Sequence, residues 1–257
     1  MTEIPDRGAL LGDGLFETLL WEGGRLVDFS AHARRLILGC AALGLAAPSE
    51  AQMRSAALEV ARTVAVDRAA VRLTWSALGG RGLERPEPCP GRLVGSASPA
   101  PEGRAPARLA TAAIRRNASS PAARLKTLSY LDNVLARRQA RQGGADEALM
   151  LNAEGEICGG AAANLFWFEG ATLVTPALAC GVLAGTVRAR VLAQAAELGL
   201  HAREAHAPAS ALTAATGLFL TNSLIGVRPV ANLDGRPVPA HPLVARLDQA
   251  LTPRASI

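Results

Sequence analysis

The stretch ARLKTLSYLDNVLARRQA, residues 123–140, contains the single lysine of the chain, Lys126, against 26 arginines. One lysine in an arginine-rich chain has two interpretations. The first is compositional drift, which leaves an occasional lysine at a tolerant position. The second is that arginine cannot do the work, because a guanidinium stays protonated, whereas a lysine amine can lose its proton and attack a carbonyl. The neighbouring motifs must decide between them.

Length and composition predict two domains with real cores. The chain has 257 residues, of which 49% are apolar and 19% are charged, and this is enough to fill two domain cores. No apolar run reaches membrane-spanning length, so we expect no membrane partner. The first residues, MTEIPDRG, lack the basic-then-apolar pattern of a signal peptide, and this favours a cytoplasmic location.

The spacing of cysteines and histidines predicts free thiols and no metal. The cysteines form no CxxC pair, which is typical of a reducing cytoplasm. The four histidines lack ligand spacing, which argues against a zinc site. The four cysteines are Cys40, Cys89, Cys158 and Cys180.

A net charge of +5 and a pI near 9.7 raise the question of nucleic-acid binding. The arginines, however, are spread along the whole chain, and aromatic residues make up only 4%. Nucleic-acid surfaces interleave basic and aromatic side chains, so we expect no nucleic-acid partner. A modest attraction for anionic small substrates fits the charge equally well.

The N-terminal part predicts a hairpin followed by helices and a strand. Residues 14–29, GLFETLLWEGGRLVDF, have two strand-like runs around an EGG turn, which indicates a β-hairpin. SAHARRLILGCAALGL follows with helical spacing, and Ser30 is a suitable cap. We expect a second helix over 50–64 and a strand over 69–80 that leads into the glycine loop LGGRG, 78–82.

The C-terminal part continues the mixed pattern. We expect a strand over 109–116, a helix over 127–144, a series of strands over 146–176, a helix over 185–199, and a strand with a DG turn over 217–235. These patterns together predict an α+β fold class.

A stretch rich in proline, glycine and charge, SPAPEGRAPAR, separates these two parts. Such composition is typical of an exposed linker. We therefore place an N-terminal α/β domain at 1–100, a linker at 101–108 and a C-terminal domain at 109–257.

Eight motifs follow one another along the chain: DRGALLGDGLFETL, SAHARRL, LGGRG, KTLSYLDNVLARRQA, GADEALMLN, AAANLFWF, LAGTVR and LTNSLIGVRPV. In this order they resemble the fold-type IV pyridoxal 5'-phosphate (PLP) enzymes, which include branched-chain and D-amino-acid aminotransferases and 4-amino-4-deoxychorismate lyase. The resemblance implies a two-domain fold like that of D-amino-acid aminotransferase, with a smaller N-terminal domain and a larger PLP-binding C-terminal domain. It also implies a homodimer and a small amino substrate that carries a carboxylate.

The resemblance assigns roles to the lysine and to one helix N-terminus. Lys126 matches the Schiff-base lysine, which binds the cofactor aldehyde and then moves protons on the substrate. The N–H groups of Thr186 and Val187, after Gly185 in AGTVR, would point at an anion, because a helix N-terminus favours negative charge. The resemblance makes that anion the PLP phosphate.

Further residues match the cofactor site. Arg35 in HARRL matches the phosphate-binding arginine. Ser223 in TNSL matches a hydroxyl that also holds the phosphate, and Asn222 precedes it. Tyr130 could bond the phenolic oxygen of the cofactor. Its spacing from Lys126 is closer to the lyase and D-amino-acid branches than to the branched-chain enzymes.

Other polar residues keep open interpretations. Arg34 is predicted to be solvated and His32 to pack or support the site. The loop LGGRG is either a flexible hairpin loop or a substrate loop of the lyase-like branch. Arg115 and Arg116 are candidates for binding a substrate carboxylate.

The family pattern breaks at Gly159. The family carries a glutamate five residues before the Asn of NLF, here Asn164, and this glutamate keeps the pyridine nitrogen protonated. Glycine cannot do so, and the electron sink is then weaker. Glu156 lies three residues earlier, which in a strand is the opposite face unless a bulge intervenes.

The break leaves three interpretations: another acid or a water replaces the glutamate, the reaction needs less electron withdrawal, or the protein is a degenerate homologue that binds PLP with little turnover. The lyase reaction forms an aromatic ring, which supplies driving force. We therefore expect a lyase that makes p-aminobenzoate and pyruvate from 4-amino-4-deoxychorismate for folate biosynthesis. The alternative enzyme is a class IV aminotransferase of branched-chain or D-amino acids.

Overall fold

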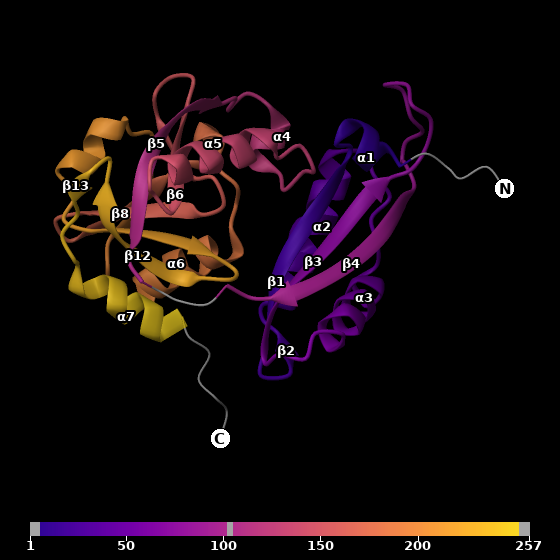
Figure 1. Ribbon diagram of the computed structural model, residues 1–257, viewed down its shortest axis with the longest axis horizontal. Helices are drawn as coiled ribbons and strands as arrows, with labels where there is room; N and C mark the ends of the chain where they lie inside the picture. Colours follow the sequence, from indigo (N-terminus) through magenta and orange to yellow (C-terminus); the bar gives the residue numbers. More distant parts are fainter. Residues whose placement is uncertain (1–5, 102–104, 252–257) are drawn as a thin grey trace. The chain divides into compact units, whose positions relative to one another are not determined.

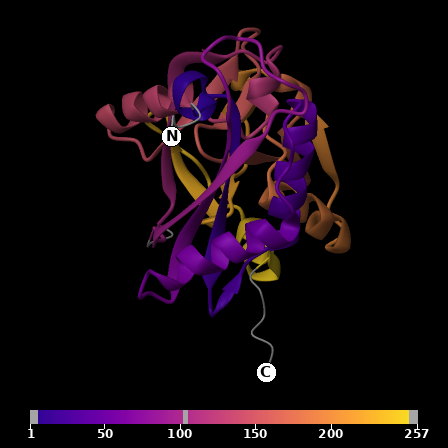
Figure 2. The same ribbon diagram turned by 90° about the vertical axis from the view of Figure 1, so that its right-hand side faces the viewer.

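The computed structural model mixes helices and strands along the whole chain (Figures 1 and 2). It describes residues 6–101 and 105–251. Part of the predicted linker, residues 102–104, therefore lies outside the described residues. None of the helices in the described ranges is long and apolar enough to span a bilayer.

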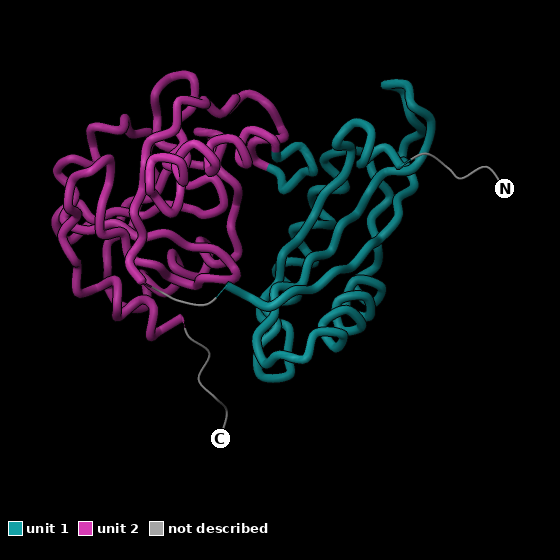
Figure 3. The backbone as a smooth tube through the Cα atoms, in the orientation of Figure 1, with its two compact units in different colours: residues 1–102, 125–130 teal, residues 103–124, 131–257 magenta. Residues whose placement is uncertain are grey.

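The chain divides into two compact units (Figure 3). Unit 1 contains residues 1–102 and 125–130, and unit 2 contains residues 103–124 and 131–257. The sequence prediction placed one boundary, at the linker. It did not foresee that the short segment with Lys126 belongs to unit 1, although the chain on both sides of this segment belongs to unit 2.

Unit 1 is built on a four-stranded antiparallel sheet in the order β2-β1-β3-β4. Its elements are α1 (Arg7–Leu11), β1 (Gly14–Glu22), β2 (Arg25–Leu26), α2 (Phe29–Ala42), α3 (Glu50–Arg62), β3 (Arg68–Ala77) and β4 (Gly91–Pro99). The strands β1 and β2 form the predicted hairpin. Gly23 and Gly24 make its turn, where both have the positive φ that favours glycine.

Helices α2 and α3 pack on one face of this sheet. Every second residue of β3 from Ala69 to Ala77 is buried, and those from Val71 onward share a core with residues of α2 and α3. The residues between them, among them Arg72, lie on the opposite face of the sheet. The alternation of apolar and polar residues therefore gives β3 one face in the core and a second face whose side chains are available for binding or catalysis.

The start of α2 differs from the prediction. Asp28 is the N-cap, with a left-handed backbone at φ 51° and no side-chain cap bond. Ser30 lies inside the first turn instead, where its hydroxyl donates to Glu50 Oε1 at 3.4 Å. The prediction was wrong because the left-handed turn at Asp28 starts the helix before Ser30. Helix α3, in contrast, begins with a capping box formed by Ser49 and Gln52.

The segment around Lys126 adds an edge to the sheet of unit 1. The Phe16 N–H donates to the Lys126 carbonyl at 2.9 Å, and the Leu128 N–H donates to the Gly14 carbonyl at 3.0 Å. These bonds use backbone groups that a helix would need. The predicted helix therefore begins later than expected, as α5 (Leu131–Gln142).

Unit 2 contains a larger mixed sheet in the order β10-β9-β8-β11-β12-β5-β6-β7, with β13 paired to β12. The strands are β5 (Ala107–Arg116), β6 (Glu147–Asn152), β7 (Ile157–Gly160), β8 (Asn164–Glu169), β9 (Thr172–Pro176), β10 (Ala202–Ala205), β11 (Leu218–Asn222), β12 (Gly226–Leu233) and β13 (Arg236–Pro237). The helices are α4 (Pro121–Arg124), α5, α6 (Thr186–Glu197), α7 (Pro242–Leu251) and the short 3-10 turns η1 (Leu178–Cys180) and η2 (Ala209–Thr213).

The central strands of unit 2 are buried on both faces. Phe166 and Phe219 stack with ring centroids 4.9 Å apart and share a core with Val191 of α6. Leu165 and Trp167, on the other face of β8, belong to a second core. Strands covered on both sides read as continuous apolar runs, which is why NLFWF was recognisable as a strand.

Candidate active site

Lys126 lies beside two aromatic rings of unit 1. Its Nζ is 4.2 Å from the centroid of the Phe16 ring and 3.5 Å from the hydroxyl oxygen of Tyr130. The rings of Phe16 and Tyr130 meet edge to face with centroids 5.0 Å apart. The half-buried amine is therefore partly shielded from water by aromatic surface.

A second cation lies in the same cluster and was missed by the sequence argument. The guanidinium carbon of Arg72 is 3.8 Å from the centroid of the Phe16 ring. Burial lowers the pKa of Arg72, and an electrostatic interaction with Tyr130 acts in the opposite direction. Arg72, Lys126, Phe16 and Tyr130 form what we call the lysine cluster. The alternation along β3 could have predicted that the Arg72 side chain lies on the face opposite the core.

Arg35 is anchored by Glu17, a buried carboxylate that is 1% exposed. The Arg35 Nε and Nη2 donate to the two Glu17 oxygens at 2.7 and 2.6 Å, and His32 Nδ1 lies 2.7 Å from Oε2. Burial raises the pKa of Glu17, but the hydrogen bonds from Arg35 and His32 outweigh it and hold the pKa at about 2. Glu17 is therefore ionised and fixes the Arg35 guanidinium. His32 is buried and Arg34 is exposed, as predicted.

A buried arginine holds the LGGRG loop. Arg7 Nη1 donates to the carbonyls of Gly80 at 2.6 Å and Gly82 at 2.7 Å, and its Nε pairs with Asp13 at 2.8 Å. The loop is thus fixed through its carbonyls, while the side chain of Arg81 is exposed. A substrate role for this loop stays a prediction.

In unit 2, helix α6 begins at Thr186, as predicted. Its N-cap, Gly185, makes no side-chain cap bond. A Cβ on Gly185 would clash with Asn164 Oδ1, so the close approach requires glycine. Asn164 Nδ2 donates to the Leu183 carbonyl at 2.9 Å, which holds the segment before the helix against β8.

The turn after β11 lies next to Asn164, which pairs with Thr221. Asn222 Oδ1 accepts the N–H groups of the two residues after Ser223, each at 3.0 Å, and so shapes this turn. Thr221 is fully buried, and its hydroxyl has no hydrogen-bond partner among the described residues. The structure therefore brings the predicted residues Asn222 and Ser223 to the sheet region where α6 begins.

Gly159 has a backbone conformation that suits glycine. Its φ is +123°, and a Cβ there would lie 3.1 Å from the Ala163 carbonyl oxygen and 3.5 Å from the Leu165 nitrogen. L-residues rarely adopt this conformation. Position 159 therefore lacks a carboxylate, and its backbone conformation and close neighbours also disfavour any side chain there.

Glu156 has other partners, although a bulge does interrupt the strand after it. The register between β6 and β7 shifts next to Gly159. The Glu156 carboxylate accepts from Asn152 Nδ2 at 2.8 Å and lies 3.0 Å from His206 Nδ1. The bulge that could have brought Glu156 to the face of Gly159 is present. The Glu156 carboxylate nevertheless contacts Asn152 and His206.

Arg115 and Arg116, the two candidates for carboxylate binding, differ in their surroundings. Arg116 Nη1 donates to the Gly181 carbonyl at 3.2 Å, and Nη2 contacts Met150 Sδ at 3.2 Å. Arg115 is exposed. Two nitrogens of the Arg116 guanidinium are therefore already bonded within unit 2, and carboxylate binding by either arginine stays a prediction.

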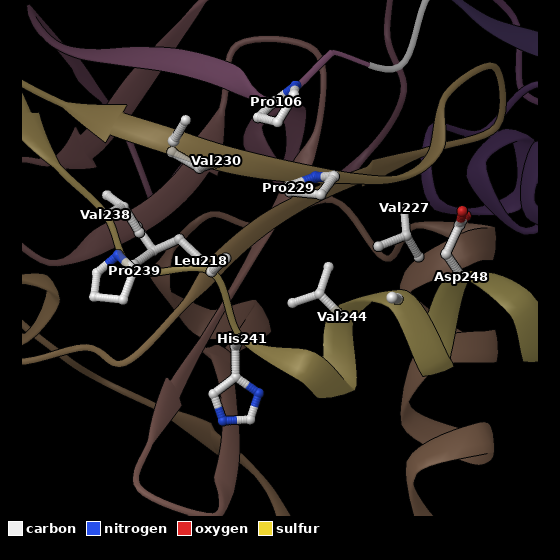
Figure 4. Close-up of a pocket in the computed structure, with 13 residues that line it drawn as sticks. Pro106, Leu218, Val227, Pro229, Val230, Val238, Pro239, His241, Val244 and Asp248 are labelled. Carbon is white, nitrogen blue, oxygen red and sulfur yellow. The ribbon is translucent and has the colours of Figure 1, made fainter.

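An apolar cavity of about 360 Å³ lies between α7 and the strands β11 and β12 (Figure 4). Valine, proline and leucine side chains line most of it, with His241 and Asp248 as its polar residues. None of the predicted site residues lines this cavity, so we do not assign it to the reaction.

Each unit, taken by itself, has residues that suit a particular group of PLP. Lys126 supplies an amine for the aldehyde. The N–H groups at the start of α6, the glycine approach at Gly185 and the unpartnered hydroxyl of Thr221 suit a phosphate. Gly159 offers nothing to the pyridine nitrogen. Unit 1 therefore offers an amine for the aldehyde, and unit 2 offers donors that suit a phosphate but no carboxylate at position 159 for the ring nitrogen.

The two-unit α+β fold and this donor set are those of a fold-type IV PLP-dependent enzyme. The family model described as amino-transferase class IV matches residues 14–233. The chain belongs to this family, whose enzymes are of the aminotransferase and lyase type. The predictions of the family, the fold class and the PLP cofactor are thereby confirmed.

Three similar proteins illustrate the range of activities. A "Putative branched-chain-amino-acid aminotransferase" from Methanocaldococcus jannaschii is 31% identical over 239 residues, which cover 90% of this chain and 82% of that protein. The crystal structure of a "Putative 4-amino-4-deoxychorismate lyase" from Legionella pneumophila matches with a TM-score of 0.90 at 28% identity, covering 98% and 94% of the two chains. A "hypothetical aminotransferase" from Mycobacterium tuberculosis in a PLP-bound form matches with a TM-score of 0.83 at 26% identity, covering 97% and 93%.

Proposed function

We propose that this enzyme is a PLP-dependent lyase that converts 4-amino-4-deoxychorismate to p-aminobenzoate and pyruvate. The observation that carries the proposal is Gly159, which lacks a carboxylate and has a φ of +123°. Transamination relies on a strongly electron-withdrawing, protonated cofactor ring. A reaction that forms an aromatic ring gains driving force from its product and needs less withdrawal. The similarity to the Legionella protein supports this choice.

Lys126 is the proposed base. PLP, when bound, withdraws electrons from the substrate carbon that carries the amino group. Lys126 Nζ takes the proton from this ring carbon, the C–O bond to the three-carbon side chain breaks, and the ring becomes aromatic. The departing enolpyruvate gains one proton and becomes pyruvate. The reaction therefore balances with no water and no second substrate.

The other members of the lysine cluster have supporting roles. Tyr130, 3.5 Å from Lys126 Nζ, orients the amine and can bond the phenolic oxygen of the cofactor. The substrate carries two carboxylates, and Arg72 supplies a fixed positive charge beside Lys126 for one of them. Arg35, held by Glu17, is the proposed phosphate arginine.

Unit 2 is proposed to supply further phosphate ligands besides Arg35. They are the N–H groups of Thr186 and Val187 and the turn at Asn222 and Ser223, with Gly185 permitting close approach. Unit 2 is accordingly the PLP-binding domain.

An aminotransferase is the second candidate, and the similarity to the Methanocaldococcus protein over 90% of this chain favours it. The two activities differ in their substrates. A transaminase must accept an amino acid and then a 2-oxo acid, whereas the lyase uses one substrate.

One experiment separates the candidates. The PLP-loaded enzyme is supplied with 4-amino-4-deoxychorismate, and p-aminobenzoate is measured by fluorescence; parallel reactions contain branched-chain or D-amino acids with 2-oxoglutarate. We expect p-aminobenzoate to form and Lys126→Ala to form none. Brisk transamination without p-aminobenzoate would contradict the lyase. Turnover of neither substrate by a PLP-loaded protein would identify a degenerate homologue.

We further infer a cytoplasmic homodimer that serves folate biosynthesis. Large apolar side chains are exposed on both units, including Leu38 at 63%, Leu83 at 88% and Leu131 at 67%. A subunit interface would cover such side chains, and the homodimer itself is what the family resemblance implies. Light scattering of the purified protein would test the assembly.

A further inference from the structure

We propose that Glu156, Cys180 and His206 form a binding site for Zn²⁺ in unit 2. The three side chains offer a carboxylate oxygen, a sulfur and an imidazole nitrogen, and these atoms all lie within 4.8 Å of one another. The site uses none of the residues assigned to the reaction. The sequence prediction argued against zinc because it was based only on ligands that lie close together in the chain.

The fold brings the three segments to one place. Strands β9 and β10 are parallel, and Pro176 at the end of one pairs with Ala205 at the end of the other. Cys180 follows β9 and His206 follows β10, so both leave the same edge of the sheet. Glu156 joins them through a bridge to Pro208.

The distances suit a tetrahedral ion. Cys180 Sγ lies 3.4 Å from His206 Nδ1, and His206 Nδ1 lies 3.0 Å from Glu156 Oε1. Zinc bonds of about 2.3 Å to sulfur and about 2.0–2.2 Å to nitrogen or oxygen place neighbouring ligands roughly 3.4–3.6 Å apart in a tetrahedron. Small shifts of the exposed imidazole therefore suffice to enclose the ion.

The carboxylate is already oriented for binding. Asn152, which is 1% exposed, donates from Nδ2 to Glu156 Oε2 at 2.8 Å and accepts the Glu156 backbone N–H at 2.8 Å. The bond to Oε2 leaves Oε1 directed at His206. Such outer hydrogen bonds are a regular feature of metal sites because they fix the ligand.

The same geometry argues against a nucleophilic Cys–His–Glu arrangement. In a catalytic triad the two ring nitrogens of histidine have different partners, one the nucleophile and the other the carboxylate. Here Nδ1 alone faces both Cys180 and Glu156. Cys180 is also 1% exposed, out of reach of a large substrate. The sulfur and the carboxylate oxygen therefore both face the same imidazole nitrogen, which suits a shared metal ion and not transfer of a proton through the imidazole ring.

The ligand set selects the metal. Thiolate and imidazole favour zinc over magnesium or calcium, which prefer oxygen ligands. The His206 side chain is 57% exposed, so the fourth position is open to water. Three protein ligands leave a fourth position that water can occupy.

The test measures zinc on the PLP-loaded enzyme. The protein is stripped with a chelator, dialysed against Zn²⁺, and analysed for zinc and PLP; affinity is measured by competition with a chromophoric chelator. We expect one zinc per chain. Cys180→Ser and His206→Ala should each weaken binding by more than about tenfold, since loss of even an outer hydrogen bond typically costs 10–100-fold.

Two controls make the result specific. His201→Ala removes an exposed histidine of the same unit and should leave affinity unchanged. Circular dichroism and PLP content show whether each variant is folded. Cobalt gives an independent readout, because visible bands of tetrahedral Co²⁺ should appear in the wild type and be absent from Cys180→Ser. Zinc binding that is missing in the wild type, or equal in all variants, would overturn the proposal.

Discussion

The amine of Lys126 lies 3.5 Å from the hydroxyl of Tyr130. These are the only lysine and the only tyrosine of the chain. Drift in an arginine-rich sequence gives no reason for the two unique residues to meet. Their contact, in a segment that belongs to unit 1 between two stretches of unit 2, favours a functional reason for the lysine.

Tyr130→Phe tests the orienting role of this hydroxyl. A hydrogen bond between neutral groups contributes about 0.5–1.5 kcal/mol, so we expect kcat to fall roughly 2–10-fold while the protein stays folded. Steady-state kinetics of p-aminobenzoate formation measures this. Ser129→Ala, a change at the exposed neighbouring residue, is the control. Equal effects of both variants would remove Tyr130 from the mechanism.

Arg72→Gln tests carboxylate binding. We expect KM for 4-amino-4-deoxychorismate to rise roughly 10–100-fold, because one charge-assisted hydrogen bond of about 1.5–3 kcal/mol is lost, with a smaller change in kcat. Arg68→Gln is the matched control, since Arg68 lies on the same face of β3 and pairs with Glu22 at 3.0 Å. A fall in kcat at unchanged KM would contradict a binding role.

Gly159→Ala separates backbone strain from the missing carboxylate. A Cβ at φ +123° and 3.1 Å from a carbonyl oxygen should lower the free energy of unfolding by about 1–3 kcal/mol. Gly155→Ala, at φ +82° with open space around it, should cost less. Urea denaturation compares the two variants. A larger loss at Gly155 would show that the crowding at Gly159 is unimportant.

Gly159→Glu and Gly159→Gln then test the carboxylate itself. We expect neither to raise p-aminobenzoate formation, because the site is shaped around glycine. The two variants share size and strain and differ in charge. Higher lyase activity in the glutamate variant alone would instead support a degenerate site that has lost its acid.

Glu17→Gln tests the anchor of Arg35. The pKa of Glu17 is lowered from 4.5 to about 2 in the folded protein, and this difference corresponds to about 3 kcal/mol of stability at neutral pH. Because the folded pKa is the lower one, this stability is present above about pH 4.5 and is lost as the pH falls toward 2. We therefore expect the wild type to be about 3 kcal/mol more stable than the variant at pH 7 and the difference to narrow at pH 3.

Denaturant titrations at both pH values check this prediction. Glu50→Gln, which removes an exposed carboxylate 3.8 Å from Arg54, should change stability by less than about 1 kcal/mol at either pH. A wild-type advantage over Glu17→Gln that stays constant from pH 7 to pH 3 would contradict the assigned cause.

Turn residues and apolar spacing in the sequence correctly predicted those parts of the fold that depend on interactions between residues close in the chain. The β1–β2 hairpin, the start of α6 after Gly185 and the alternation of β3 follow from turn residues and apolar spacing. Thr127 and Leu128 were assigned to a helix because their spacing is helical. Their backbone instead bonds to β1, a long-range contact that no local pattern contains.

The candidate site divides in the same way. Lys126 and the α6 N-terminus stand in short motifs, so the sequence could predict a role for them, and these roles stay predictions. Glu17 was missed because its partners Arg35 and His32 lie on the next helix. The Glu156–Cys180–His206 cluster was missed because its side chains come from three separate segments.

The central claim is that Lys126 holds PLP, and one measurement tests it directly. The purified protein is incubated with PLP, its visible absorption spectrum is recorded before and after borohydride, and the modified residue is located by peptide mass spectrometry, with Lys126→Ala alongside. We expect a visible band that borohydride removes, with the reduced cofactor attached to Lys126, and no attachment in the variant. A wild-type protein with no band, or a variant that fixes PLP equally well, would contradict it.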